Sequence, residues 1–299
     1  MGILPPAPFG RLLTAMVTPF TADGALDVAG AQALAARLVD QGCDGLVISG
    51  TTGESPTTTD AEKDRLLRAV IEATAGRATV LAGVGTYDTA HTMESAVAAE
   101  KAGAAGLLVV TPYYNRPPQA GLLAHFRAVA DATDLPVMLY DIPIRTGTPI
   151  ATETLLRLAE HPKIVAVKDA KGDLPASSTV LAATDLVYYS GDDVLNLPLL
   201  AIGAAGSVSV VGHAFAPQIR ELIEAFDSGD VARAIALHHK LMPVYTGFFR
   251  TQGVILTKAA LQCLGLPSGP VRLPLVDATP EQIEVLRADC AAAGLELPA

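Results

Sequence analysis

One lysine stands where a buried strand is predicted to end. Lys168 closes the apolar run at 164–167 and is followed by Asp169. An amine attacks a carbonyl only when unprotonated, and a lysine with an ordinary pKa of about 10.4 is almost wholly charged at pH 7. Burial lowers that pKa, as in lysines that form Schiff bases. Lys168 is therefore a candidate nucleophile; the alternative is a lysine whose stem packs on the strand end while its ammonium reaches solvent.

A Gly-flanked turn supplies hydroxyls and backbone N–H groups after the second predicted strand. The segment reads Gly50-Thr51-Thr52-Gly53, followed by Glu54. Such a nest binds carboxylate or phosphate oxygens without needing a cation. The alternative is an ordinary turn between a strand and a helix, in which Gly and Thr are common.

Two further polar side chains follow the fifth predicted strand. Tyr140 ends this strand and faces the same rim as Lys168 if strand alternation holds, so its phenol is a candidate proton shuttle. Arg145 lies in the loop beyond Pro143, where its planar fork could grip a carboxylate. Taken alone, Tyr140 could equally pack apolar surface, and Arg145 could be an ordinary loop arginine.

These groups must be positioned by the surrounding secondary structure, in which short apolar runs alternate with segments of helical periodicity. The predicted strands are 12–18, 45–49, 79–82, 106–110, 136–140, 164–168, 186–190 and 206–210; the helices between them are 28–41, 61–74, 89–102, 122–132, 152–160 and 195–202. The continuous apolar character of the strands is typical of strands covered on both faces. Eight such units predict a (β/α)₈ TIM barrel, with its active site at the carboxyl ends of the strands. A doubly wound sheet is the rival, but Gly83-Val84-Gly85 lacks the third glycine of a dinucleotide-binding turn.

Helix signals flank several of these periods. Thr59 and Glu62 have the spacing of a capping box, and Asp88 and Thr152 stand at N-cap positions. Glycines at predicted helix ends are expected to adopt left-handed conformations: Gly42, Gly76 and Gly103.

The pattern changes to helices alone after the eighth unit. Further helices are predicted at 217–227, 231–245, 254–264 and 280–293. We expect a barrel over residues 1–224 and a small C-terminal helical appendage over residues 225–299.

The amino-acid composition and net charge exclude several classes of binding partner. The 299 residues carry a net charge of −10, which argues against nucleic acid or an anionic membrane as a partner. The three cysteines are far apart in the sequence, as expected of thiols in a reducing compartment, and the histidines form no metal-binding pattern. The short apolar run near the N-terminus is interrupted by Pro19, so neither a signal peptide nor a membrane span is predicted. The expected location is the cytoplasm.

Several motifs resemble one family in order and spacing. These are the Gly50 to Glu54 turn, Thr111-Pro112-Tyr113-Tyr114-Asn115-Arg116-Pro117, the Tyr140 to Gly147 loop, Val167-Lys168-Asp169 and Ser190-Gly191-Asp192-Asp193. The chain resembles the dihydrodipicolinate synthase family of pyruvate-dependent class I aldolases, a group that also holds N-acetylneuraminate lyase. The resemblance covers most of the chain.

The resemblance implies a role for each residue that matches a motif. Lys168 would form a ketimine with pyruvate, and Tyr140 would donate and accept protons. Thr51 would link Tyr140 to Tyr114, which in this family enters the site from a neighbouring subunit. The remaining residues are implied to bind substrate: Thr52 and Val208 would hold pyruvate, Arg145 would receive the carboxylate of aspartate semialdehyde, and Gly191 and Asp192 would line the same cavity.

The implied activity is the condensation of pyruvate with L-aspartate 4-semialdehyde, in the pathway to diaminopimelate and lysine. No metal or organic cofactor is implied, and the family suggests a homotetramer, a dimer of dimers in which Tyr114 crosses the tight interface. Two alternatives stay open at this point. One is another pyruvate aldolase that acts on a sugar acid or an aromatic keto acid, and the other is a barrel that binds ligands but has lost catalysis.

One region departs from relatives that lysine inhibits. Those relatives carry histidine and other polar residues after the turn that here is Gly50-Thr51-Thr52-Gly53, the threonine turn, and Asn and Glu after the third strand. Here the corresponding positions hold Asp60, Lys63, Tyr87 and His91. Lys63 would place a like charge beside the effector's ammonium, so weak or absent inhibition by lysine is predicted.

Overall fold

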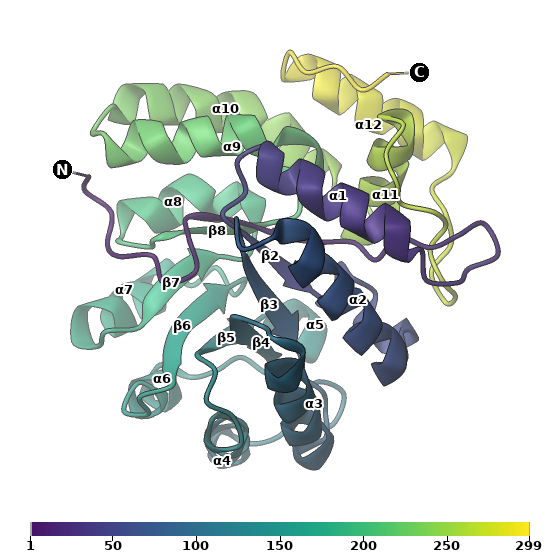
Figure 1. The fold of residues 1–299 in the computed structure, drawn as a ribbon. Coiled ribbons are helices and arrows are strands. Elements are labelled where there is room, and N and C mark those ends of the chain that lie inside the picture. Colours follow the sequence, from purple (N-terminus) through teal and green to yellow (C-terminus); the bar gives the residue numbers. More distant parts are fainter. Residues whose placement is uncertain (1, 299) are drawn as a thin grey trace.

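Eight parallel strands form a closed barrel around which the helices are arranged (Figure 1). The computed structural model describes residues 2–298. Each strand pairs with its neighbours in the sequence, and β8 returns to β1. The strands are β1 (Leu12–Ala15), β2 (Gly45–Ile48), β3 (Thr79–Gly83), β4 (Gly106–Val110), β5 (Val137–Asp141), β6 (Ile164–Asp169), β7 (Val187–Ser190) and β8 (Gly206–Ser209). Every predicted range overlaps one strand, so the TIM barrel is confirmed and the doubly wound sheet is wrong.

Successive strand residues enter two different apolar layers. One layer fills the barrel and includes Leu13, Val47, Leu81, Leu108 and Met138. The other lies between the strands and the surrounding helices and includes Leu12, Leu46, Val80, Leu107 and Val137. Since both faces of each strand are covered, the strands read as continuous apolar runs rather than alternating ones.

Helices follow the strands around the outside of the barrel. They are α1 (Val28–Asp40), α2 (Asp60–Thr74), α3 (Thr89–Ala102), α4 (Gln119–Asp131), α5 (Pro143–Thr146), α6 (Thr152–Leu158), α7 (Leu174–Ala183) and α8 (Asn196–Ala201), with short 3₁₀ helices η1 (Ser55–Thr57) and η2 (Asp193–Leu195). Six of the eight α-helices were predicted, and α5 and α7 were missed. In α7 the first turn offered a signal, because Asp173 accepts a hydrogen bond from the Ala176 N–H and Pro175 stands in that turn.

The predicted helix caps are confirmed with one exception. Thr59 and Glu62 form both hydrogen bonds of a capping box, and Asp88 accepts from the Ala90 N–H. Thr152 is instead the first helical residue, and the N-cap of α6 is Ala151, which has no side-chain acceptor. All three predicted glycines have positive φ angles: Gly42, Gly76 and Gly103.

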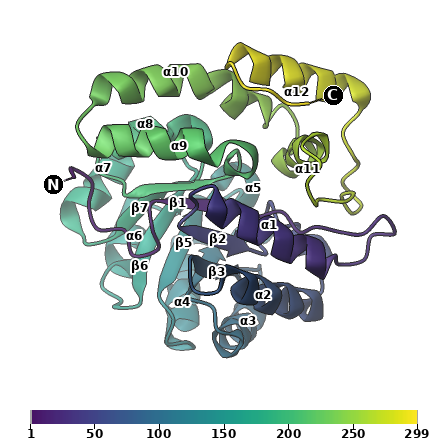
Figure 2. The same ribbon diagram turned by 45° about the horizontal axis from the view of Figure 1, so that its top comes forward.

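Between β8 and residue 298 the chain forms helices and no strand: α9 (Gly212–Asp227), α10 (Val231–Gly247), α11 (Gly253–Cys263) and α12 (Pro280–Ala292). In both views α10 and α12 form an outer layer, with α9 between α10 and the barrel (Figures 1 and 2). Helix α9 begins five residues before the predicted start at 217, and non-helical Phe215 marks a kink just before Pro217. The boundary predicted after residue 224 falls inside α9 and stays a prediction.

Within residues 2–298, no helix has both the length and the apolar character required to cross a bilayer. In the same part of the chain, no group of three or more His, Cys, Asp and Glu side chains is placed to hold a metal ion. The three cysteines are free: Cys43, Cys263 and Cys290.

Barrel closure between β8 and β1 depends on one close backbone approach. A Cβ at Gly206 would lie 1.8 Å from the carbonyl oxygen of Arg11. That carbonyl accepts a hydrogen bond from the Ser207 N–H at 2.8 Å, so it cannot move aside without opening the ladder.

We therefore expect Gly206→Ala to destabilise the fold by about 1–3 kcal/mol or more, because the methyl group forces the two strands apart. Chemical denaturation followed by circular dichroism measures the change. Gly121→Ala in α4 is the matched control, since its nearest contact would be Pro117 Cβ at 3.4 Å. Equal midpoints for the two variants would contradict the close-approach argument.

Candidate active site

A cavity of about 670 Å³ opens at the carboxyl ends of the strands. This size suits a small-molecule substrate. Most of the residues singled out from the sequence lie on its wall: Thr51, Thr52, Tyr140, Arg145, Lys168, Gly191 and Asp192. They come from the loops and strand ends of β2, β5, β6 and β7, which the barrel brings together at one rim.

Strand pairing places Lys168 beside Tyr140. The two residues are register partners in β5 and β6. Lys168 Nζ lies 4.2 Å from the centroid of the Tyr140 ring, and the two residues are 4% and 5% exposed. The alternative of a lysine reaching into solvent is therefore wrong.

Burial changes the protonation of both groups. It lowers the pKa of Lys168 to about 7, with a smaller contribution in the same direction from Arg145, while Asp193 opposes the shift. Burial raises the pKa of Tyr140 to about 12, against smaller opposing effects of Arg145 and the neighbouring Thr51 hydroxyl. Near neutral pH a substantial fraction of the Lys168 amine is thus a free base, beside a phenol that retains its proton.

Gly191 is required by the packing of Lys168 and not by its own backbone conformation. A Cβ at Gly191 would lie 2.9 Å from Lys168 Cγ and 3.1 Å from Lys168 Cε. Any side chain here would push the lysine from its place beside Tyr140. The next residue, Asp192, accepts a hydrogen bond from the Val194 N–H, and burial raises its pKa.

No role for Asp193 is predicted from the sequence. This buried carboxylate accepts hydrogen bonds from the Ser209 hydroxyl and from the N–H groups of Val210 and Val211, and so links the end of β7 to the end of β8. It also raises the pKa of Lys168. The adjacent pair of aspartates after β7 was the available signal.

The turn after β2 is compact. The Glu54 N–H donates to the Thr51 carbonyl at 3.1 Å, and the Thr18 hydroxyl donates to the Gly53 carbonyl at 2.6 Å. Thr52 is buried on the cavity wall. The turn therefore presents both threonines from a backbone that is fixed on both sides.

Two predicted site residues lie elsewhere. Val208 is fully buried in the barrel interior, and the cavity wall contains Val210 from the end of that strand instead. Tyr114 is 92% exposed at a φ of 70°, a strained conformation for tyrosine. It lines a neighbouring cavity of about 340 Å³, which shares Thr51 and Tyr140 with the first.

The outer wall of the main cavity comes from the C-terminal helical region, for which the sequence predicts no role in the site. These residues end α10, begin α11 or join the two: Tyr245, Thr246, Phe249, Thr251, Gln252, Gly253 and Val254. The apolar periodicity of this region predicts helices, but it does not indicate which cavity these helices line.

Comparison with known proteins gives the family. The profile of the Dihydrodipicolinate synthetase family matches residues 8–293. The chain belongs to this family. It is 72% identical over 291 residues to 4-hydroxy-tetrahydrodipicolinate synthase of Acidothermus cellulolyticus, covering 97% of this chain and 94% of that one. It is 64% identical to 4-hydroxy-tetrahydrodipicolinate synthase 2 of Streptomyces coelicolor, with 98% of each chain covered. The resemblance inferred from the motifs is confirmed.

Solved structures agree with this assignment. The dihydrodipicolinate synthase of Cyanidioschyzon merolae, crystallised with lysine bound, aligns with a TM-score of 0.95 and 45% identity over 97% of this chain and 100% of that one. A Bacillus anthracis dihydrodipicolinate synthase aligns with a TM-score of 0.92 and 41% identity, over 95% of this chain and 98% of that one.

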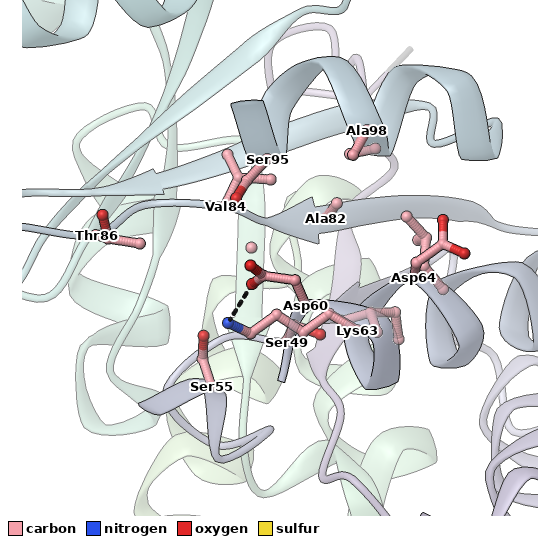
Figure 3. A pocket seen from close by; sticks show the side chains of 14 residues that line it. Ser49, Ser55, Asp60, Lys63, Asp64, Ala82, Val84, Thr86, Ser95 and Ala98 are labelled. Atoms are coloured by element: carbon pink, nitrogen blue, oxygen red, sulfur yellow. Dashed lines mark ion pairs between the residues drawn. The ribbon is translucent and has the colours of Figure 1, made fainter. Parts of the chain in front are cut away.

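The four residues from which weak inhibition by lysine is predicted share one cavity beside the threonine turn. Asp60, Lys63, Tyr87 and His91 all line a space of about 480 Å³. Lys63 Nζ and His91 Nε2 each lie 3.5 Å from Asp60 Oδ1. Figure 3 shows Lys63 and Asp60 meeting in an adjoining cavity of about 60 Å³ between β2, β3, α2 and α3. The one carboxylate among the four is thus already paired.

The lowered pKa of Lys168 predicts how its reactivity depends on pH. The amine loses its proton as pH rises through about 7, so reductive methylation of Lys168 by formaldehyde and cyanoborohydride should rise about tenfold per pH unit below that value and level off above it. Peptide mass analysis after brief labelling measures the extent of modification. Lys101, exposed at the end of α3, controls for the reagent's own pH dependence. A Lys168 profile that still climbs steeply above pH 9 would show an unshifted amine.

Proposed function

We propose that this chain is a lyase of the aldolase type that condenses pyruvate with L-aspartate 4-semialdehyde to 4-hydroxy-tetrahydrodipicolinate, in the pathway to diaminopimelate and lysine. The observation that carries the proposal is the buried amine of Lys168, 4.2 Å from the Tyr140 ring centroid in a substrate-sized cavity. The names of the curated relatives support this reaction over that of a sugar-acid lyase. A barrel that only binds ligands does not require a buried lysine that is partly deprotonated at neutral pH.

The first half of the reaction activates pyruvate. The Lys168 amine attacks the C2 carbonyl of pyruvate, and water leaves as the iminium forms. The cationic iminium accepts the electron pair released when a C3 proton is removed, which gives an enamine. Tyr140, with its high pKa, supplies and recovers protons, and Thr51 connects it to Tyr114. Thr52 and its backbone N–H hold the pyruvate carboxylate, and Val208 or its neighbour Val210 supplies apolar contact.

The second half joins the two substrates. The enamine carbon attacks the aldehyde carbon of aspartate semialdehyde, whose carboxylate is held by Arg145 between Gly191 and Asp192. The substrate's own amine then attacks C2 of the new iminium. The bond from C2 to Lys168 breaks, the ring closes, and the free enzyme is restored without any metal or organic cofactor.

We also propose a homotetramer, a dimer of dimers in which Tyr114 of one subunit completes the site of another. The 92% exposure of Tyr114 supports this role, because a large side chain fixed in a strained backbone and left open to solvent is typical of an interface residue. One solved relative, 36% identical, is described as the first monomeric dihydrodipicolinate synthase variant, which implies association among other members. The cytoplasmic location stays a prediction.

The function is tested by trapping and by turnover. Borohydride reduction in the presence of pyruvate should add a pyruvyl adduct to the peptide of Lys168, and Lys168→Met should abolish both the adduct and turnover coupled to a dihydrodipicolinate reductase. Tyr140→Phe keeps the ring but loses the proton, so turnover should fall by about 100-fold or more. If the adduct forms but the protein turns over a sugar acid and not aspartate semialdehyde, the protein is instead one of the other pyruvate aldolases. No adduct would leave only a binding role.

The paired Asp60 predicts a poor response to L-lysine. The effector's ammonium would meet Lys63, and Asp60 is already engaged. Steady-state assays should show weak or no inhibition, and a sub-millimolar inhibition constant would contradict the prediction. Lys63→Gln removes the like charge and should strengthen inhibition, whereas Lys101→Gln in α3 should not.

A further inference from the structure

Glu54 ends the turn that carries Thr51 and Thr52, yet the reaction above gives its side chain no role. The residue is 2% exposed, and its φ of 54° is uncommon outside glycine. A carboxylate taken out of water is tolerated only when its charge is paired and hydrogen-bonded. The pairing here comes from the C-terminal helical region, more than 200 residues away in the sequence.

Lys258 of α11 is the charged partner. Its Nζ lies 2.6 Å from Glu54 Oε1, and the Lys258 residue is 1% exposed. The ammonium also donates to the Pro270 carbonyl at 2.7 Å and lies 4.2 Å from the centroid of the Phe20 ring. The Lys258 amine is thus held by a carboxylate, a carbonyl and an aromatic ring.

Arg272, in the loop between α11 and α12, holds the same segment by a different set of contacts. Its backbone N–H donates to Glu54 Oε2 at 2.8 Å. Its guanidinium donates to the Thr57 carbonyl at 2.8 Å and to Glu62 Oε1 at 2.6 Å. The guanidinium carbon lies 4.1 Å from the centroid of the Phe20 ring. One loop therefore fixes the residues that follow the threonine turn and the first turn of α2.

We propose that Glu54, Lys258 and Arg272 form a clamp through which the C-terminal helical region positions the threonine turn. They are positioning residues, since the groups proposed to relay protons and to bind pyruvate belong to Thr51 and Thr52. Glu54 transmits the constraint directly, because its own N–H closes the turn onto the Thr51 carbonyl at 3.1 Å. The inference rests on the proposed function of the two threonines.

Stability alone does not explain a buried ion pair here. Replacing such a pair by apolar side chains of similar size is often neutral or stabilising, because desolvating two charges costs about as much as their attraction returns. What this pair adds is a fixed position, since each Glu54 oxygen has its own partner: Oε1 lies 2.6 Å from Lys258 Nζ, and Oε2 accepts a hydrogen bond from the Arg272 N–H. Contacts on both oxygens fix the carboxylate, and with it the turn from which it projects.

The test compares Lys258→Met, Glu54→Gln and the double variant in the full-length protein. Lys258→Met leaves a buried carboxylate unpaired, so kcat/KM for pyruvate should fall by about 100-fold, with a raised KM because Thr52 moves from the pyruvate carboxylate. The pH midpoint of Lys168 labelling should stay unchanged, because burial, Asp193 and Arg145 set the pKa of that amine. The double variant removes the unpaired charge, and we expect it to regain thermal stability without regaining wild-type KM.

Two further variants keep the result decisive. Arg233→Met, in the same C-terminal helical region, breaks an exposed ion pair with Glu221 and should leave all kinetic constants unchanged. Arg272→Lys alters a partly exposed side chain, so it should fold, and it should raise KM for pyruvate less than Lys258→Met does. If the double variant folds and has the wild-type KM, the clamp proposal is wrong. If the double variant does not fold, a wild-type KM in Arg272→Lys has the same consequence. Failure of the wild-type protein to form the Lys168 adduct would instead overturn the proposed function.

Discussion

The site depends on keeping one amine out of water. A shift of the Lys168 pKa from 10.5 to about 7 corresponds to about 5 kcal/mol of differential interaction between its two protonation states. That is comparable with the whole stability of a typical domain, so the surrounding fold has to hold the amine in place against it. The opposing charge of Asp193 limits the shift. With less burial the amine would stay protonated at neutral pH. Without Asp193 the charged form of the amine would be less stable, and the iminium carries the same positive charge.

The pairing of β5 with β6 separates two kinds of chemistry onto the two faces of the sheet. On the inner face Tyr140 stands opposite Lys168, and one residue further along Asp141 pairs with Asp169 on the outer face. Both aspartates are buried, and burial raises the pKa of Asp141 to about 6 although Lys171 lies 3.5 Å from it. A register slip of one residue would exchange the faces, placing carboxylates in the barrel and the amine among the helices. The hydrogen-bond ladder is therefore also what selects the nucleophile.

The parts of the molecule that the sequence predicts are those set by local pattern. Strands and long helices are predicted from apolar runs and helix caps. The residues at the rim of the barrel are predicted from the polar side chains at the end of each strand. The four-residue helix α5 is too short to show a period, and α7, which mixes Ala, Leu, Ser and Thr, shows little amphipathic contrast. The contacts of Glu54 with Lys258 and Arg272 join positions more than 200 residues apart, and no local pattern encodes such a pairing. Likewise, Val210 rather than Val208 lines the cavity because of where β8 ends at the rim, a detail of packing rather than of composition.

A barrel alone does not complete this site. Its threonine turn lies between two residues with positive φ, Ser49 and Glu54, and such turns need contacts from outside to hold one conformation. Those contacts come from α11 and the loop after it, while the segment between α10 and α11 forms the outer wall of the cavity. In the proposed reaction, the helices that follow β8 thus affect the positions of both substrates, because they fix the turn that holds pyruvate and enclose the space for the second substrate. A substitution in this region can therefore alter catalysis without touching either substrate or any group that transfers a proton.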